Sequence, residues 1–199
     1  LKFAYERSFK YMMIISIPIA LGTILLANRI ILLIYGTEYT PSIIALQILI
    51  WTIVFMFING LSGNLLASIN RQIVVTKVTG IGAIVNIGLN LLMIPKFSYI
   101  GASITTVATE FIVLLILMYI LSKTDYAIRM SSVKNALKVI ISSLVIVILV
   151  KYLNNINLAL LIFTCVFAYC GMLYVTKALD RRDMLMMKSL LIRDWRKNG

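Results

Sequence analysis

The sequence predicts an all-α fold, a polytopic membrane helix bundle with six transmembrane helices, and two observations support this prediction. Of the 199 residues, 61% are hydrophobic and 13% are charged, and the mean hydropathy is +1.00. A soluble domain of this size cannot bury so much apolar surface. The apolar residues also recur in runs long enough to cross the ~30 Å hydrocarbon core of a bilayer. These runs cover residues 11–35, 41–69, 73–94, 100–121, 136–153 and 158–176.

Turn-forming and polar residues separate the six runs. Gly36 follows the first run, as is typical of a helix C-terminus, and Pro41 can occupy the first turn of the second helix. Pro95 closes the third run. The polar residues 122–135 precede the fifth run, and residues 154–157, which are rich in asparagine, follow it. Each run is therefore predicted to form one helix.

Positive charge lies almost entirely on one side of the predicted bundle. With six crossings, both termini share a side with the second and fourth connections, whereas Arg29, Lys96 and Lys151 lie toward the other side. Because cytoplasmic loops carry an excess of Lys and Arg, we predict a multi-pass protein of the cell membrane with both termini in the cytoplasm. The cytoplasmic side holds sixteen of the nineteen Lys and Arg residues: Lys2, Arg7, Lys10, Arg71, Lys77, Lys123, Arg129, Lys134, Lys138, Lys177, Arg181, Arg182, Lys188, Arg193, Arg196 and Lys197.

The composition argues against several classes of function. The net charge of +12 is spread over short connections between apolar runs, so no basic patch for nucleic acid is expected. The sequence contains no His and neither a GxxxxGK[ST] loop nor an HExxH motif. Cys165 and Cys170 lie five residues apart in one apolar run and are interpreted as unbridged membrane-helix residues. We therefore expect no enzyme activity, no metal ion and no cofactor.

Glu110 is the strongest functional candidate, because an ionisable group inside a bilayer is costly. It lies about ten residues into the fourth run, which at 1.5 Å per residue places it ~15 Å deep, near the midplane. Ser103 and Thr106 share its helix face and extend a polar stripe toward the outer surface. Two alternatives stay open. The carboxylate either faces a water-filled cavity, where it binds a proton or pairs with a cation, or it joins two helices.

Small and amide residues form a second group of candidates. Asn86 and Asn90 lie four residues apart in the third run, and Gly82 extends the same row. Such a stripe suits close helix packing with interhelical hydrogen bonds, and the alternative is that it lines a transport cavity. Gly60 and Gly63 in the second run either loosen that helix or let a neighbour approach closely.

Two further residues stand out in the first run. Pro18 lies inside a predicted helix and is a candidate for a hinge or a packing position. Arg29 lies about six residues, or ~9 Å, from the outer end of this helix. Its guanidinium either snorkels to the surface or adds positive charge to a cavity that receives an anionic substrate.

The order of these features resembles a known family of transporters. Pro18 leads into a Gly-Xaa-Xaa-Tyr turn at Gly36, and asparagines precede Pro95, a short turn and then Gly101-Ala102. This order, over about residues 1–122, resembles the C-terminal half of polysaccharide-biosynthesis flippases of the O-antigen type, which belong to the multidrug/oligosaccharidyl-lipid/polysaccharide exporter superfamily. The matching stretches are IPIALGTILLANRIILLIYGTEY, ALQILIWTIVFMFINGLSGNLLASINRQ and VTGIGAIVNIGLNLLMIPKFSYIGASITTVATEF.

The resemblance implies a component of a transporter that moves a polyprenyl-linked oligosaccharide from the inner to the outer leaflet by alternating access, for cell-surface polysaccharide biosynthesis. It divides the chain into residues 1–122, a four-helix part of the C-terminal lobe, and residues 136–176, an additional transmembrane helix pair. Residues 123–135 form the cytoplasmic connection between these parts, and residues 177–199 form a basic, amphipathic cytoplasmic tail.

The resemblance also implies the partners of the chain, which are membrane lipid and the lipid-linked glycan. Family members resemble two lobes of six helices that rock around a cationic cavity. This chain corresponds to a partial second lobe that begins at the third helix of that lobe. We therefore expect the missing N-terminal lobe, or a partner chain, to complete it. Because the sequence starts at Leu1 rather than Met, we also expect it to be a piece of a longer protein.

Two other functions remain open. One is a multidrug or cation antiporter of the same superfamily, which would more naturally place several acidic residues in its cavity. The other is a non-transporting, truncated membrane subunit of a glycan pathway. In the flippase interpretation, Arg29 attracts the pyrophosphate of the substrate, and Glu110 is coupled to transport through a proton or through packing.

Overall fold

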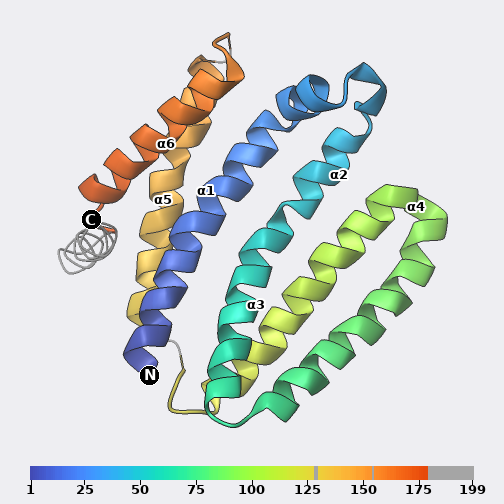
Figure 1. The fold of residues 1–199 in the computed structure, drawn as a ribbon, viewed down its shortest axis with the longest axis vertical. Coiled ribbons are helices and arrows are strands. Elements are labelled where there is room, and N and C mark those ends of the chain that lie inside the picture. The colour runs from blue at the N-terminus through green and yellow to red at the C-terminus, as the bar shows by residue number, and fades with distance from the viewer. Residues whose placement is uncertain (128–129, 154, 179–199) are drawn as a thin grey trace, which may run out of the picture.

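The computed structural model describes residues 1–127, 130–153 and 155–178, and all regular structure within these residues is helical (Figure 1). The predicted all-α fold is therefore confirmed. The amphipathic tail that we predicted for residues 177–199 lies almost wholly outside the described residues and stays a prediction. The helices are α1 (Lys2–Ile34), the 3₁₀ turn η1 (Thr37–Tyr39), α2 (Ser42–Leu49), α3 (Trp51–Ser68), α4 (Gln72–Ser122), α5 (Met130–Tyr152) and α6 (Leu158–Val175).

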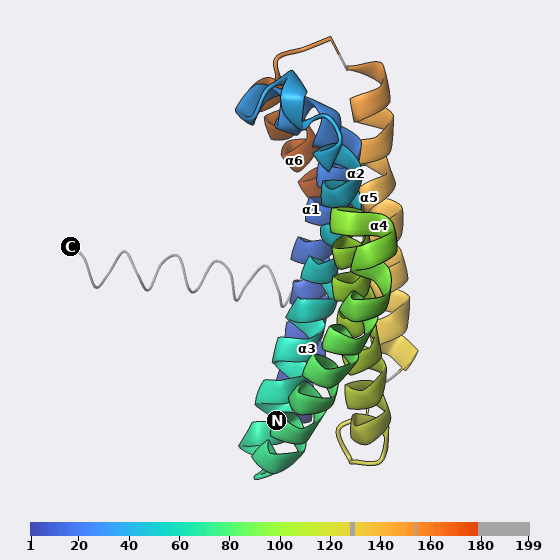
Figure 2. The same ribbon diagram turned by 90° about the vertical axis from the view of Figure 1, so that its right-hand side faces the viewer.

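The helices form a shallow slab (Figure 2). The long helix α1 lies in its middle, with α5 and α6 on one side and α3 on the other, and α4 follows beyond α2 and α3 (Figure 1). Because α1 contacts both groups of helices, it links the α5–α6 pair to the remainder of the bundle.

Helix α1 is longer than the apolar run that predicted it. It begins at Lys2, whereas the run begins at residue 11. The early residues include Lys2, Glu6 and Arg7, which are good helix formers that a hydropathy pattern does not count. The apolar run therefore marks the part of α1 that suits lipid, and the helix itself continues toward the aqueous side.

The second predicted helix is divided in two. Residues 41–69 were expected to form one helix, and the structure has α2 and α3 on either side of Ile50. Ile50 keeps helical dihedral angles of φ −60° and ψ −24°, so the interruption is slight and the two helices remain nearly continuous. Together they still provide a 27-residue apolar stretch from Ser42 to Ser68.

Helix α4 folds back on itself at Ser98. Its 51 residues comprise a first limb, residues 72–97, and a second limb, residues 99–122, which lie side by side (Figure 1). Ser98 has φ 50° and ψ −131°, outside the helical region. The third helix was predicted to end at Pro95, but helical structure continues to the residue before Ser98. Proline weakens a helix by removing a hydrogen bond, whereas the reversal itself requires the unusual positive φ three residues later.

The last two helices differ little from their prediction. Helix α5 begins at Met130 and takes up part of the connection expected over residues 123–135. Helix α6 covers Leu158–Val175, close to the predicted run. The side chain of Asn157 accepts a hydrogen bond from the backbone N–H of Ala159 at 3.0 Å, which caps the N-terminus of α6. Within the described residues Cys165 and Cys170 are both free thiols, as predicted.

Four stretches of the described residues are long and apolar enough to cross a membrane: α1, Ser42–Ser68, α4 and α6. The chain is thus a multi-pass helical membrane protein by composition and helix length. Helix α5 is not among the four, and α4 counts as one stretch although it reverses direction at Ser98. The number of six crossings therefore stays a prediction.

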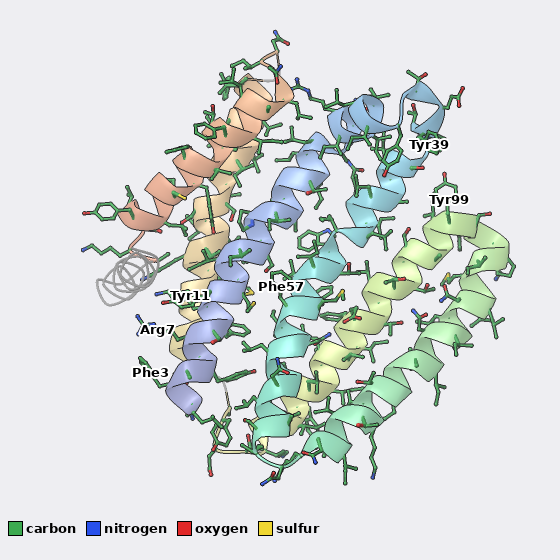
Figure 3. The ribbon with its side chains drawn as sticks, in the orientation of Figure 1. Phe3, Arg7, Tyr11, Tyr39, Phe57 and Tyr99 are labelled. Atoms are coloured by element: carbon green, nitrogen blue, oxygen red, sulfur yellow. The ribbon has the colours of Figure 1, made fainter. Side chains whose placement is uncertain are left out.

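Contacts between distant residues define the two ends of the slab. At one end the Lys2 ammonium donates to the backbone oxygen of Asp125 at 2.7 Å. At the opposite end the Tyr99 hydroxyl donates to the backbone oxygen of Pro41 at 3.3 Å. Figure 3 shows Tyr99 at the reversal of α4, on the side of the molecule away from Phe3. The first turn of α1 and the connection after α4 therefore share one end of the bundle.

Candidate functional site

A carboxyl and a carboxamide meet in the middle of the bundle. Asn59, buried on α3, donates from Nδ2 to Glu110 Oε2 at 2.8 Å and to the backbone oxygen of Glu110 at 3.0 Å. Glu110 lies midway between Ser98 and Ser122 along the second limb of α4. We call Asn59 and Glu110 the carboxyl–amide pair. It joins α3 to the middle of the second limb of α4.

The surroundings of Glu110 contain very little charge. Helix α4 packs against α2 and α3, and neither of these helices contains Asp, Glu, Lys or Arg. The first limb of α4 carries Lys77 and Lys96 only near its two ends. Among the residues that the structure describes, the hydrogen-bond partner of the Glu110 carboxyl is therefore an amide and not a cation.

The amide oxygen of Asn59 is the remaining polar atom of this site. Asn59 Oδ1 is buried and has no hydrogen-bond partner among the described residues. An unpaired acceptor in an apolar environment costs about 1–3 kcal/mol. The carboxyl–amide pair thus leaves one acceptor unused next to an ionisable group.

The two hydroxyl groups of the stripe predicted to lead to Glu110 form hydrogen bonds within their own helix. Ser103 Oγ donates to the backbone oxygen of Tyr99 at 2.9 Å, and Thr106 Oγ1 donates to that of Ala102 at 2.8 Å. Both hydroxyl protons are thus used within their own helix, a common choice for Ser and Thr in apolar helices. The two hydroxyls do not form a path of donors toward Glu110.

A second polar cluster joins the two limbs of α4. Asn86 Nδ2 donates to Thr109 Oγ1 at 3.2 Å, and Asn90 Nδ2 donates to Asn86 Oδ1 at 2.9 Å. Thr105 Oγ1 lies 2.6 Å from Asn90 Oδ1, and it donates either to this atom or to the backbone oxygen of its own helix. We call these four residues the amide–hydroxyl cluster. Its contacts support the packing alternative for Asn86 and Asn90.

Sequence reasoning did not single out Thr105 or Thr109, and it noted Asn59 only as part of a polar section of the second run, not as the partner of Glu110. A signal for the two threonines exists, because they lie four residues apart, the same spacing as Asn86 and Asn90 in the preceding helix. Two adjacent helices with matched polar spacing can pair across their interface. No spacing of polar residues in the sequence pairs Asn59 with Glu110 in this way.

The predicted glycine positions differ in how closely a neighbour approaches them. A Cβ atom at Gly82 would lie 2.8 Å from Val113 Cγ2, so this glycine permits close contact between the two limbs of α4. A Cβ at Gly63 would meet Val75 Cγ1 at an ordinary 3.5 Å, and one at Gly60 would meet nothing within 4 Å. Pro18 lies inside α1, near its middle.

Arg29 lies near the C-terminal end of α1, whereas the carboxyl–amide pair lies on α3 and α4. Its Nη2 atom donates to the backbone oxygen of Ile156, in the connection between α5 and α6, at 2.6 Å. Arg29 thereby ties the end of α1 to the α5–α6 pair. Its contribution to a substrate cavity stays a prediction.

The Arg29 contact gives a testable distinction. Replacing Arg29 with Lys keeps the charge but loses the planar donor, and Arg29→Ala loses both. If the residue acts through the Ile156 contact, both variants should lower the apparent melting temperature by about 1–4 °C, the effect of one solvent-exposed charged hydrogen bond. Thermal unfolding of the purified protein measures this. If Arg29→Lys leaves the melting temperature unchanged and Arg29→Ala lowers it, the result would instead support an electrostatic role for Arg29.

Residues 1–92 match the family model MatE. The uncharacterized membrane protein MJ1068 of Methanocaldococcus jannaschii is 33% identical over 172 residues, a match that covers 86% of this chain and 34% of that protein. The probable low-salt glycan biosynthesis flippase Agl15 of Haloferax volcanii is 26% identical over 94 residues, or 47% of this chain and 20% of that protein.

Among solved structures, the chain is similar to the lipid II flippase MurJ in its inward closed conformation. The TM-score is 0.76 at 16% sequence identity, and the match covers 92% of this chain and 40% of that one. At this identity the likeness shows a shared fold. The chain spans about a third of the length of MJ1068 and less than half of MurJ. Together, these matches confirm the resemblance to a partial flippase of the exporter superfamily.

Proposed function

From this resemblance to the flippases of the multidrug/oligosaccharidyl-lipid/polysaccharide exporter superfamily, we propose that the chain is a component of a transporter that flips a polyprenyl-linked oligosaccharide from the inner to the outer leaflet. The observation that carries the proposal is that the chain is similar in sequence to a probable glycan flippase. The fold shared with a lipid II flippase supports it independently of that match. The first of these proteins is named a probable flippase of glycan biosynthesis, and the second is named a flippase of lipid II.

The proposed transporter contains more than this chain. Because the chain corresponds to about a third of MJ1068 and 40% of MurJ, a further lobe or a partner chain would complete the pathway for the substrate. We further propose six crossings with both termini in the cytoplasm. The shared end of Lys2 and Asp125 supports this arrangement, since it gathers cationic segments on one face of the membrane.

Within this transporter, we assign the carboxyl–amide pair a role in coupling. It connects α3 to α4 in a layer where these helices and α2 carry no other charge. A proton on Glu110 would change its hydrogen bond to Asn59 from one made by a carboxylate to one made by a neutral acid, and charge-assisted hydrogen bonds are the stronger kind. Protonation would thereby alter how tightly α3 holds α4.

A cation antiporter is the second candidate, and Glu110 favours it, because an intramembrane carboxyl without a cationic partner is typical of ion-coupled transport. The two functions differ in substrate and in phenotype. An antiporter would confer resistance to cationic drugs and would leave surface glycan unchanged.

Complementation tests the proposed function directly. The full-length gene that encodes this chain should restore surface glycan to a strain that lacks its glycan flippase, and the lipid-linked precursor should stop accumulating on the inner leaflet. The control is the same gene without the coding region for residues 1–122. Restored drug resistance without restored glycan would support the antiporter, and neither phenotype in a strain with normal protein level would support the non-transporting subunit.

A further inference from the structure

Pro18 leaves one backbone carbonyl of α1 without its helical partner. In an α-helix the N–H of residue 18 would bond to the carbonyl of Ile14, but proline has no N–H. This position lies in the apolar middle of α1, where water is not available to hydrogen-bond the carbonyl. A proline in such a helix is tolerated when a neighbouring group satisfies the freed carbonyl.

A tyrosine from another helix supplies this group. The hydroxyl of Tyr169, on α6, donates to the backbone oxygen of Ile14 at 2.8 Å. Tyr169 is only 6% exposed, so its hydroxyl is held in place by its surroundings. Helices α1 and α6 therefore meet at one hydroxyl group, next to the proline.

The environment of this hydroxyl is apolar and closely packed. Tyr169 belongs to a core cluster with Ile17, the neighbour of Pro18, and with Val139 and Leu161, which are both 0% exposed. Hydrogen bonds are electrostatically stronger where the local dielectric is low, and unpaired groups there are more costly. The contact between Tyr169 and Ile14 is therefore strong for a single hydrogen bond.

We propose that Tyr169 replaces the hydrogen bond that Pro18 removes, and that the α5–α6 pair thereby acts as a latch on the flexible point of α1. While the bond is made, α1 keeps the conformation seen in this structure. When it breaks, α1 can bend at Pro18. Because α1 links the α5–α6 pair to α3, such a bend would move the two groups of helices relative to each other. Tyr169 is a positioning residue in this mechanism, which does not depend on the nature of the substrate.

A double-mutant cycle tests the latch without any transport assay. Tyr169→Phe removes the hydroxyl and keeps the ring, so it should lower the apparent melting temperature of the purified protein by about 2–6 °C. In a Pro18→Ala background, the N–H of residue 18 can bond to Ile14, and the same substitution should cost less than half as much. Tyr174→Phe is the matched control, since this tyrosine lies on the same helix and is 68% exposed; it should change nothing.

Distance measurements provide a second test on α1 itself. Spin labels at Phe3 and Leu33, which are exposed near the two ends of α1, report its bending once both cysteines are replaced by alanine. Tyr169→Phe should broaden the distribution of distances between the labels, and adding Pro18→Ala should narrow it again. The proposed latch is excluded if Tyr169→Phe leaves this distribution unchanged. It is also excluded if Tyr169→Phe lowers the melting temperature equally in the wild-type and Pro18→Ala backgrounds.

Discussion

Replacing Glu110 with glutamine should lower glycan export about tenfold while the amount of folded protein stays normal. Glutamine has nearly the same shape and its Oε1 can still accept the hydrogen bond from Asn59, which spans 2.8 Å in this structure. It cannot bind or release a proton. A tenfold effect corresponds to about 1.4 kcal/mol in the activation free energy of transport.

Two control variants separate coupling from packing. Glu110→Leu removes both the proton and the hydrogen bond to Oε2, and leaves Asn59 Nδ2 with only the backbone oxygen of residue 110 as an acceptor, so it should destabilise the protein as well as impair export. Glu38→Gln alters an exposed carboxylate in η1, outside the bundle, and should be neutral. Export is measured as surface glycan per amount of membrane protein. Normal export by the Glu110→Gln variant at normal protein level would exclude a mechanistic role for this carboxyl and leave it a packing residue.

Substituting Gly101 with alanine should have the largest effect on stability. A Cβ atom at this position would lie 2.5 Å from the backbone oxygen of Met93 and 2.8 Å from its carbonyl carbon. Both are backbone atoms, so the two limbs of α4 would have to separate at their reversal. We expect a loss of about 3 kcal/mol in the free energy of unfolding, as for a strongly overpacked core site, and a melting temperature lower by about 6–12 °C.

The same helix contains the control for this substitution. A Cβ atom at Gly88 would meet nothing within 4 Å, so Gly88→Ala should be neutral or stabilise α4 by up to about 1 kcal/mol through helix propensity. Gly82→Ala should fall between the two, because its close neighbour, Val113 Cγ2, belongs to a side chain that can rotate. Equal melting temperatures for the Gly101→Ala and Gly88→Ala variants would show that the limbs are not held at this distance in solution.

The helices were predictable because apolar residues must be continuous over any segment that lies in lipid. The run at residues 158–176 corresponds to α6, Leu158–Val175, to within one residue. The prediction was least accurate where a helix continues beyond its apolar part, as at Lys2, and where a helix is interrupted without a change in polarity, as at Ile50. Hydropathy measures the environment of a segment and does not record its backbone hydrogen bonds.

The candidate site was predicted in part. The sequence predicts Glu110 near the membrane midplane from its distance to the helix end, and it places Asn86 and Asn90 on one stripe of an apolar run. Their partners could not be predicted, because the direction of a side chain depends on how each helix is rotated toward its neighbours. The same limit applies to Arg29, whose contact with Ile156 joins residues 127 positions apart in the sequence.

The local pattern of apolar residues is sufficient to identify a helical, multi-pass protein, and the pattern of basic residues predicts that its positive charge lies on one side. Only the tertiary structure decided that Glu110 is bound by an amide from α3, and that the carbonyl freed by Pro18 is bound by Tyr169 from α6. Both contacts satisfy buried polar groups across a helix interface. Polar groups in an apolar medium must find partners, but only the packing of the helices selects which partners lie within reach.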